Sequence, residues 1–153
     1  MLNQVDFPLT NSQISEFILD KGYTTYFKLQ QALSELLESG FIREESTHHR
    51  TFYHLTEDGA ETIHYFTNDI SPAIQHDIDE FLKEKHYELK NEMSVKADYF
   101  ENSNMEYSVR CQVIEQGLPL IDLTVTAPTE SEAATIANNW QKRNQEIYAL
   151  VMA

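Results

Sequence analysis

"GFIREESTHHRTFYHLTEDG", residues 40–59, decides how the first half of the chain folds. "FIREE" predicts a short strand, "STHH" a polar turn, and "RTFYHLT" a second strand. In the second strand Thr51, Tyr53 and Leu55 share one face, and Phe52 and His54 share the other. Thr56 then stands where a threonine caps the N-terminus of a helix. The stretch therefore predicts a β-hairpin that leads directly into a helix.

Two helices are expected before this hairpin. Thr10 and Gln13 form a capping box at the start of the first, and Gly22 ends it. The second runs from Tyr26 to Ser39 and ends at Gly40. Its expected buried stripe consists of Leu29, Ala32, Leu33, Leu36 and Leu37. Two helices joined by a short turn that contains glycine form a helix-turn-helix.

The hairpin resembles the wing of winged-helix transcriptional regulators of the MarR and PadR kind. In those proteins G-(L/F)-I leads into the first wing strand, a basic tip follows, and Y-x-L-T-x-x-G closes the motif. The matching residues here are 40–42, Arg50 and 53–59. The chain as a whole resembles more closely a domain-of-unknown-function family of proposed regulators from low-GC Gram-positive bacteria. Those proteins join a winged helix to a C-terminal αβ domain, which the resemblance implies here as well.

The chain departs from that pattern at its beginning. Winged helices start with a helix ahead of the segment that corresponds to "PLTNSQI", and only residues 1–8 precede Leu9 and Thr10 here. We therefore expect the first helix to be truncated or absent. Either the chain starts inside it, or another segment covers that side of the core.

The second half of the chain begins near Ile70. Ser71 and Pro72 open a helix that reaches about Glu92. Three strands are expected next, the clearest being "MEYSVRCQV", in which Met105, Tyr107, Val109, Cys111 and Val113 alternate with polar residues. Thr129 and Glu132 form a capping box for the last helix. The predicted fold is therefore α+β, with a winged helix-turn-helix in residues 1–70. Residues 71–153 form an αβββα domain with an antiparallel three-stranded sheet, and this domain is expected to serve dimerisation or sensing.

Composition limits the classes of function. The formal net charge is −14, which argues against loose charge-driven binding to nucleic acid or to anionic membranes. One cysteine excludes an intrachain disulfide, and no apolar run is long enough to span a bilayer. A soluble, cytoplasmic protein is expected.

Neither an enzyme nor a metal site is expected. The four glycines build no phosphate-binding loop, and no G-x-S-x-G or paired Cys/His motif is present. The four histidines of residues 46–66 lack the short spacings of zinc ligands, so solvated histidines at the hairpin tip and one histidine packed against the core are the more economical interpretation. Alternating apolar neighbours make Cys111 a buried thiol, and no cofactor is expected. Trp140, Tyr99 and Tyr107 are interpreted as core residues, with a small-ligand site as the alternative.

The leading hypothesis is a DNA-binding transcriptional regulator. The helix 26–39 would read the major groove and the hairpin 41–56 would contact phosphates or the minor groove. The candidate DNA-binding residues are Thr24, Thr25, Tyr26, Lys28, Gln30, Gln31, Arg43, His48, His49 and Arg50.

The second hypothesis is an acidic winged-helix module that binds proteins and not DNA. Residues 1–67 hold four basic and ten acidic side chains, so the local charge is 4 − 10 = −6. Regulators with this fold read two half-sites as symmetric pairs, so a homodimer is expected, with a protein partner as a further alternative and no membrane contact.

Overall fold

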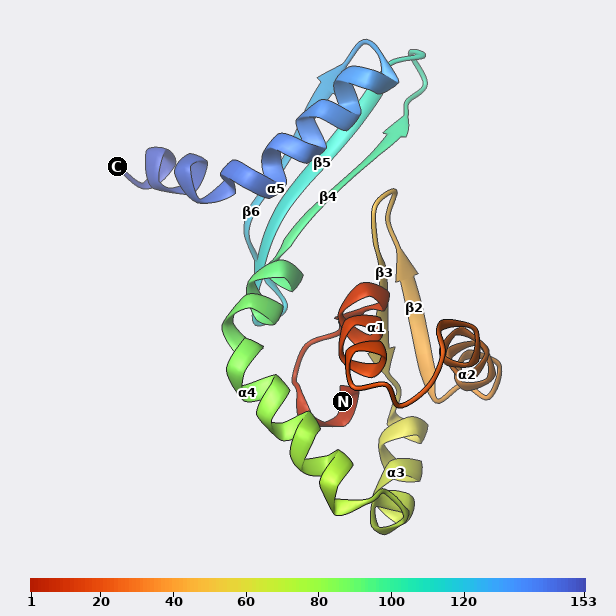
Figure 1. Ribbon diagram of the computed structural model, residues 1–153. Helices are drawn as coiled ribbons and strands as arrows, with labels where there is room; N and C mark the ends of the chain where they lie inside the picture. Colours follow the sequence, from red (N-terminus) through yellow and green to blue (C-terminus); the bar gives the residue numbers. More distant parts are fainter. The chain divides into compact units, whose positions relative to one another are not determined.

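The computed structural model describes the backbone of residues 1–153 and every side chain except that of Tyr87. The chain is a mixed α+β protein with two antiparallel three-stranded sheets (Figure 1). The helices and strands follow in the order η1 (Leu2–Gln4), β1 (Leu9–Thr10), α1 (Asn11–Asp20), α2 (Tyr26–Glu38), β2 (Ile42–Ser46), β3 (Thr51–Leu55), α3 (Glu57–Phe66), η2 (Thr67–Asp69), α4 (Pro72–Ser94), β4 (Val95–Glu101), β5 (Tyr107–Glu115), β6 (Leu118–Ala127) and α5 (Glu130–Met152).

The chain divides into two compact units. The first comprises residues 1–46 and 50–90, and the second comprises residues 47–49 and 91–153. Most of α4 thus packs with the first unit, so the division along the chain falls after Lys90 and not near Ile70. The reason lies in α4 itself, because its side chains Leu82 and Leu89 are buried in the core of the first unit.

The helices of the first unit begin and end where the sequence predicts. The Thr10 side chain accepts a hydrogen bond from the Gln13 amide, and the Gln13 side chain accepts one from the Thr10 amide, which completes the capping box of α1. Gly22 and Gly40 adopt positive φ angles of 67° and 71° just beyond α1 and α2. Glycine adopts this left-handed conformation without a side-chain clash, so both helices end there.

A short strand that the sequence analysis did not predict completes the first sheet. β1 pairs with β3, with Leu9 opposite Tyr53, and the strand order is β1-β3-β2. Leu9 is fully buried. The segment ahead of α1 therefore contributes a strand to the sheet of the hairpin.

Two segments cover the side of the core where a first helix was expected to be missing. Met1, Leu2, Val5 and Phe7 pack partly buried against the first unit's core cluster, and so do side chains of α4. A short 3-10 helix with the residues after it, and α4, thus cover this part of the core.

The apolar stripe of α2 is only partly buried, which corrects the expectation from its spacing. Leu29 and Leu33 are buried, whereas Ala32 and Leu36 are exposed. These two side chains line an apolar cavity of about 350 Å³, together with side chains of α1 and α3 such as Ile14, Ile18 and Ile63. The helix therefore has one open apolar edge.

The hairpin strand β3 is buried on both of its faces. Tyr53 is buried on one face, and Phe52 on the opposite face is only 1% exposed. Leu55 is half-buried. Truncating Leu55 to Ala should therefore destabilise the fold by about 2 kcal/mol, near the lower end of the range for core leucines.

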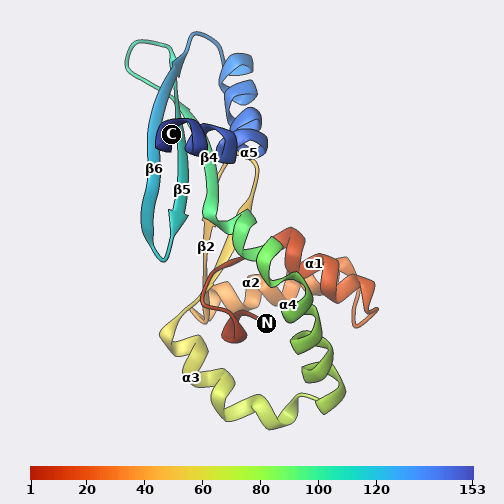
Figure 2. The same ribbon diagram turned by 90° about the vertical axis from the view of Figure 1, so that its left-hand side faces the viewer.

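The second unit is a sheet with strand order β4-β5-β6 and a helix on one face. Figure 2 shows α5 lying along that face. Trp140 is buried there and its indole N–H donates to the Gln112 carbonyl at 3.1 Å. Tyr99 is buried and Tyr107 packs against the same cluster, as the core interpretation predicted. Met105 lies in the turn before β5 with φ 57° and is 80% exposed, so the predicted strand begins later than its alternation suggested.

Candidate nucleic-acid interface

The first turn of α2 presents a row of exposed side chains. Thr25 caps the helix by accepting a hydrogen bond from the Lys28 amide at 3.4 Å. Tyr26 is 52% exposed and Phe27 is 83% exposed, and Lys28 and Gln31 are exposed on the following residues. This turn combines two aromatic rings, a cation and an amide, which are groups that can contact base edges in a groove.

Gln30, a predicted base-reading residue, has a different role. Its side chain exchanges two hydrogen bonds with the side chain of Asn11 on α1, at 2.9 and 3.1 Å. The Asn11 amide also donates to the hydroxyl of Tyr53 at 3.2 Å. Gln30 thereby joins α2 to α1 and to the hairpin, and its polar atoms are directed inward.

Thr24 and Gln31 are placed differently from each other. Thr24 is half-buried ahead of the helix cap. Gln31 is exposed, and its side-chain amide donates to Glu35 one turn later at 3.0 Å. Gln31 is therefore accessible, but its hydrogen bond to Glu35 would have to break before its side chain could bind a base.

The hairpin supplies two arginines. Arg43 on β2 is exposed and stands opposite His54 in the register of the sheet. His54 itself pairs with Glu45 at 3.0 Å. Arg50, which directly precedes β3, is half-buried. Carboxylates thus lie among the cations of the hairpin, which weakens its positive field.

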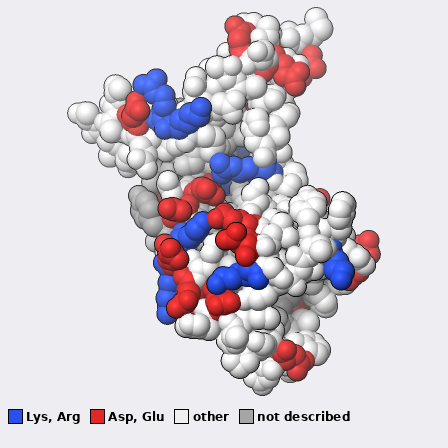
Figure 3. Space-filling view, in the orientation of Figure 1, with Lys and Arg blue, Asp and Glu red and all other residues white. Residues whose placement is uncertain are grey.

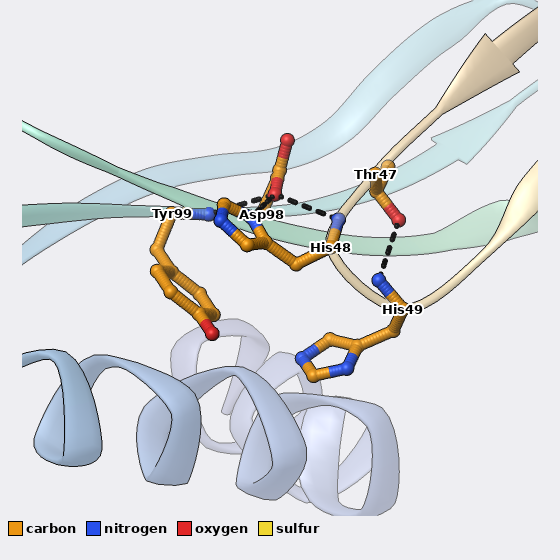
Figure 4. Close-up of polar contacts among 5 residues, drawn as sticks. All are labelled: Thr47, His48, His49, Asp98 and Tyr99. Atoms are coloured by element: carbon orange, nitrogen blue, oxygen red, sulfur yellow. Dashed lines mark hydrogen bonds and ion pairs between the residues drawn. The ribbon is translucent and has the colours of Figure 1, made fainter.

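The tip of the hairpin, residues 47–49, belongs to the second compact unit. Figure 4 shows the His48 ring bonded to the Asp98 carboxylate and stacked on Tyr99, with ring centroids 3.9 Å apart and an interplanar angle of 11°. The His48 amide also donates to Asp98 at 3.2 Å. Burial alone would raise the pKa of Asp98, but the hydrogen bonds from His48 and from the Tyr99 amide hold it below its ordinary value. His48 is therefore committed to this contact.

The neighbouring His49 makes weaker contacts. Its amide donates to the Thr47 hydroxyl at 3.4 Å, and its ring lies 6.2 Å from the Tyr99 ring, tilted by 57°. Its side chain is exposed. Of the two tip histidines, His49 is the one with an accessible ring.

Two lysines of the first unit are paired with acids. Lys21 lies 3.6 Å from Asp77, and Lys85 forms an ion pair with Glu16. Figure 3 shows acidic and basic side chains interleaved over α1 and α4. These two lysines therefore add no uncompensated positive charge to the first unit.

Phe27 is the exposed residue that the sequence analysis missed. The helical periodicity of α2 predicts its exposure, because Phe27 lies two residues before the buried Leu29 and one turn before the exposed Gln31. Side chains one turn apart share a helix face.

Two further findings concern only the part of the chain that the structure describes. No group of three or more His, Cys, Asp and Glu side chains there is arranged to hold a metal ion. None of its helices is both long enough and apolar enough to cross a bilayer.

The comparison with protein families gives one match. The family described as "Domain of unknown function (DUF4364)" matches residues 1–153. The chain belongs to the DUF4364 family. No curated protein and no solved structure matches the chain. Membership in DUF4364 thus covers every residue of both compact units, and the function of this family member has to be argued from its own side chains.

Proposed function

We propose that this chain is a DNA-binding transcriptional regulator whose first unit is a winged helix. The observation that carries the proposal is the exposed first turn of α2, where Tyr26, Phe27, Lys28 and Gln31 face solvent on a helix capped by Thr25. The major groove of B-DNA admits one α-helix, and the N-terminal residues of that helix contact the base edges.

The β2–β3 hairpin would act as the wing. Arg43 and Arg50 are its cations, and a guanidinium fork suits a phosphate or a narrow minor groove. His49 would add a donor at the tip, whereas His48 would first have to leave Asp98. Arg43 and Arg50 therefore carry the expected contact from the wing.

The small number of cations on the proposed surface should make DNA binding depend only weakly on salt concentration. Lys28, Arg43 and Arg50 are the cations of the proposed surface, and so only about two to four phosphates can be neutralised by each subunit. The logarithm of the binding constant should then fall with the logarithm of the salt concentration with a slope of about −2 to −4 per subunit. Specific contacts, and two subunits on two half-sites, would have to supply the remaining affinity.

Selection from a random DNA pool at moderate salt tests the proposal. The expected result is a family of sites with two related half-sites, and Arg50→Ala should weaken binding to all of them similarly. Gln31→Ala should change the preferred sequence instead. If the paired protein binds no DNA even at low salt, the proposal fails.

The alternative function is a protein-binding module, and the apolar cavity favours it. Leu36, Ile63 and Phe66 line this cavity of about 350 Å³, and Phe66 is 55% exposed. Such a surface accepts the apolar face of a helix. Leu36→Asp should abolish the binding of a partner helix in this cavity and leave the outward face of α2 intact. DNA binding that persists in Leu36→Asp would therefore support the regulator.

A further inference from the structure

α5 carries an apolar stripe that is incompletely covered within the second unit. The stripe consists of Ile136, Trp140, Ile147 and Leu150, and with the basic Arg143 these residues recur at alternating spacings of four and three. This is the spacing by which one helix packs along another. Trp140 is buried beneath the sheet, but Leu150 is 80% exposed. The stripe therefore changes from a core surface to an open surface along a single helix.

The helix also continues beyond the sheet. Figure 1 shows the last turns of α5 extending past the edge formed by β6. Val151 and Met152 are 74% and 67% exposed there. Apolar side chains at such exposures, contiguous on one helix end, mark a contact surface rather than scattered surface residues.

A hollow lies beside this helix in the same unit. It has a volume of about 480 Å³ and is formed between β5, β6 and α5. Its walls are mostly apolar and include Leu123, Val125, Ile136 and Trp140. Ile147 and Leu150 of the helix end line the same hollow. The exposed helix end and the hollow therefore form one apolar surface, and a self-complementary contact can use such a surface.

The charges along the hollow are self-complementary too. Arg143 and Glu146 both line it, and they pair with each other at 2.8 Å with more than half of each side chain exposed. Figure 3 shows opposite charges side by side over this part of α5. If two such helices run antiparallel about a two-fold axis, Arg143 of each copy can face Glu146 of the other. Leu150 then faces Asn139, at the hollow.

We propose that a second copy of this chain docks on this surface, with the end of each α5 in the hollow of the other copy. The charge pattern favours a second copy over an unrelated partner, because one positive and one negative group meet their opposites across a two-fold axis without like-charge repulsion. The inference rests on the pair of subunits in the proposed function, and it names the surface that forms the pair.

Sedimentation velocity of the full chain without DNA tests the proposal. The wild type should be a dimer at about 10 µM, where an interface with a Kd near 1 µM is mostly formed. Leu150→Asp should raise the Kd by about 30-fold or more, as expected for a central contact residue. The helical signal in circular dichroism should stay unchanged, because Leu150 is exposed in the single copy.

Met105→Asp is the matched control. Met105 has the same 80% exposure and lies in the turn before β5, away from α5 in the chain, and so it should leave the Kd unchanged. A charge exchange gives a second measurement. Arg143→Glu should weaken the pair by at least about tenfold, and adding Glu146→Arg to the same chain should restore it.

Each contrary result overturns the inference. A wild type that stays monomeric at about 100 µM, a dimer that Leu150→Asp does not weaken, or an equal effect of Met105→Asp would each show that this surface does not form the pair. Because no DNA is present, a failure here is distinct from a failure of DNA binding.

Discussion

The first turn of α3 lies so close to the Phe41 carbonyl that Gly59 has no room for a side chain. A Cβ built on Gly59 would stand 2.0 Å from the Phe41 oxygen and 2.9 Å from a methyl group of Leu55. The neighbouring Thr56 holds this turn in place, since its amide donates to the same Phe41 oxygen at 3.1 Å and its hydroxyl donates to the Gly40 carbonyl at 2.6 Å. The glycine of the "LTEDG" segment is therefore required by steric contact.

Gly59→Ala should destabilise the protein by about 3 kcal/mol or more, because the added methyl group meets backbone that cannot rotate away. Urea unfolding followed by circular dichroism measures this difference. Glu61→Ala, at an exposed position of the same helix, is the control and should change the free energy of unfolding by less than about 0.5 kcal/mol. Equal stability of Gly59→Ala and the wild type would mean that the helix does not approach Phe41 so closely.

Gln30→Ala should lower stability without changing any DNA sequence preference. The side chain is engaged with Asn11, so its removal costs about 1 kcal/mol for the lost hydrogen bonds. Thermal unfolding and a repeat of the DNA selection provide the two measurements. A changed consensus sequence with unaltered stability would return Gln30 to the base-reading set.

Phe27→Ala should remove recognition of a thymine methyl group. The ring of Phe27 is exposed on the outward face of α2, and an aromatic ring in the major groove packs against the apolar methyl group of thymine. Replacing one thymine of the selected site by uracil should weaken the wild type about fourfold, the effect of one lost methyl contact of about 0.8 kcal/mol. Phe27→Ala should be insensitive to the same replacement, whereas Gln31→Ala should remain sensitive. Sensitivity in Phe27→Ala would assign the methyl contact to another residue.

The contact between Asp98 and His48 should show in the acid limb of the stability profile. The folded-state pKa of Asp98 lies below its ordinary value of 3.8, so the carboxylate contributes stability above that value and loses it as the pH falls through the folded pKa. Asp98→Asn should therefore lower the melting temperature at pH 6 and have a smaller effect at pH 3. A constant difference between the two pH values would show that the carboxylate charge is not involved.

Cys111 should be unreactive in the folded protein. Burial raises the pKa of its thiol from 9.0 to about 11, so the nucleophilic thiolate is scarce at neutral pH. A disulfide reagent at pH 8 should react slowly with the native chain and rapidly in urea. Because the raised pKa favours the neutral thiol of the folded state, this stabilisation should be lost as the pH rises from about 9 to about 11. Fast native reaction would mean that the strand opens readily.

Local signals in the sequence predicted most of the helix ends. The capping threonines at positions 10, 56 and 129 and the glycines at 22 and 40 act within one helical turn, and each has the expected conformation or hydrogen bond. The alternation of Val109 and Cys111 likewise placed both on the buried face of β5. Interactions between residues three or four apart depend on the chain alone, and so they can be read from it.

Contacts between residues far apart in the chain could not be read in this way. Nothing near Gln30 in the sequence indicates that Asn11 would engage it, and nothing near His48 indicates Asp98 as its partner. The open edge of α2 at Leu36 likewise depends on which other segments reach it. Of the residues predicted to bind DNA, Gln30 and His48 are therefore engaged by other side chains of the fold, since packing decides which polar side chains point outward.

The amino-acid sequence by itself determined the two strands of the hairpin, the presence of three later strands, the helices with their caps and the acidic charge, because periodicity and capping are local properties. Only the tertiary structure decided that β1 joins the hairpin, that α4 completes the first core and that Phe52 is buried on the second face of β3. These features follow from the burial of apolar surface between distant segments. That free energy depends on which segments can pack together in three dimensions, and no short stretch of sequence contains it.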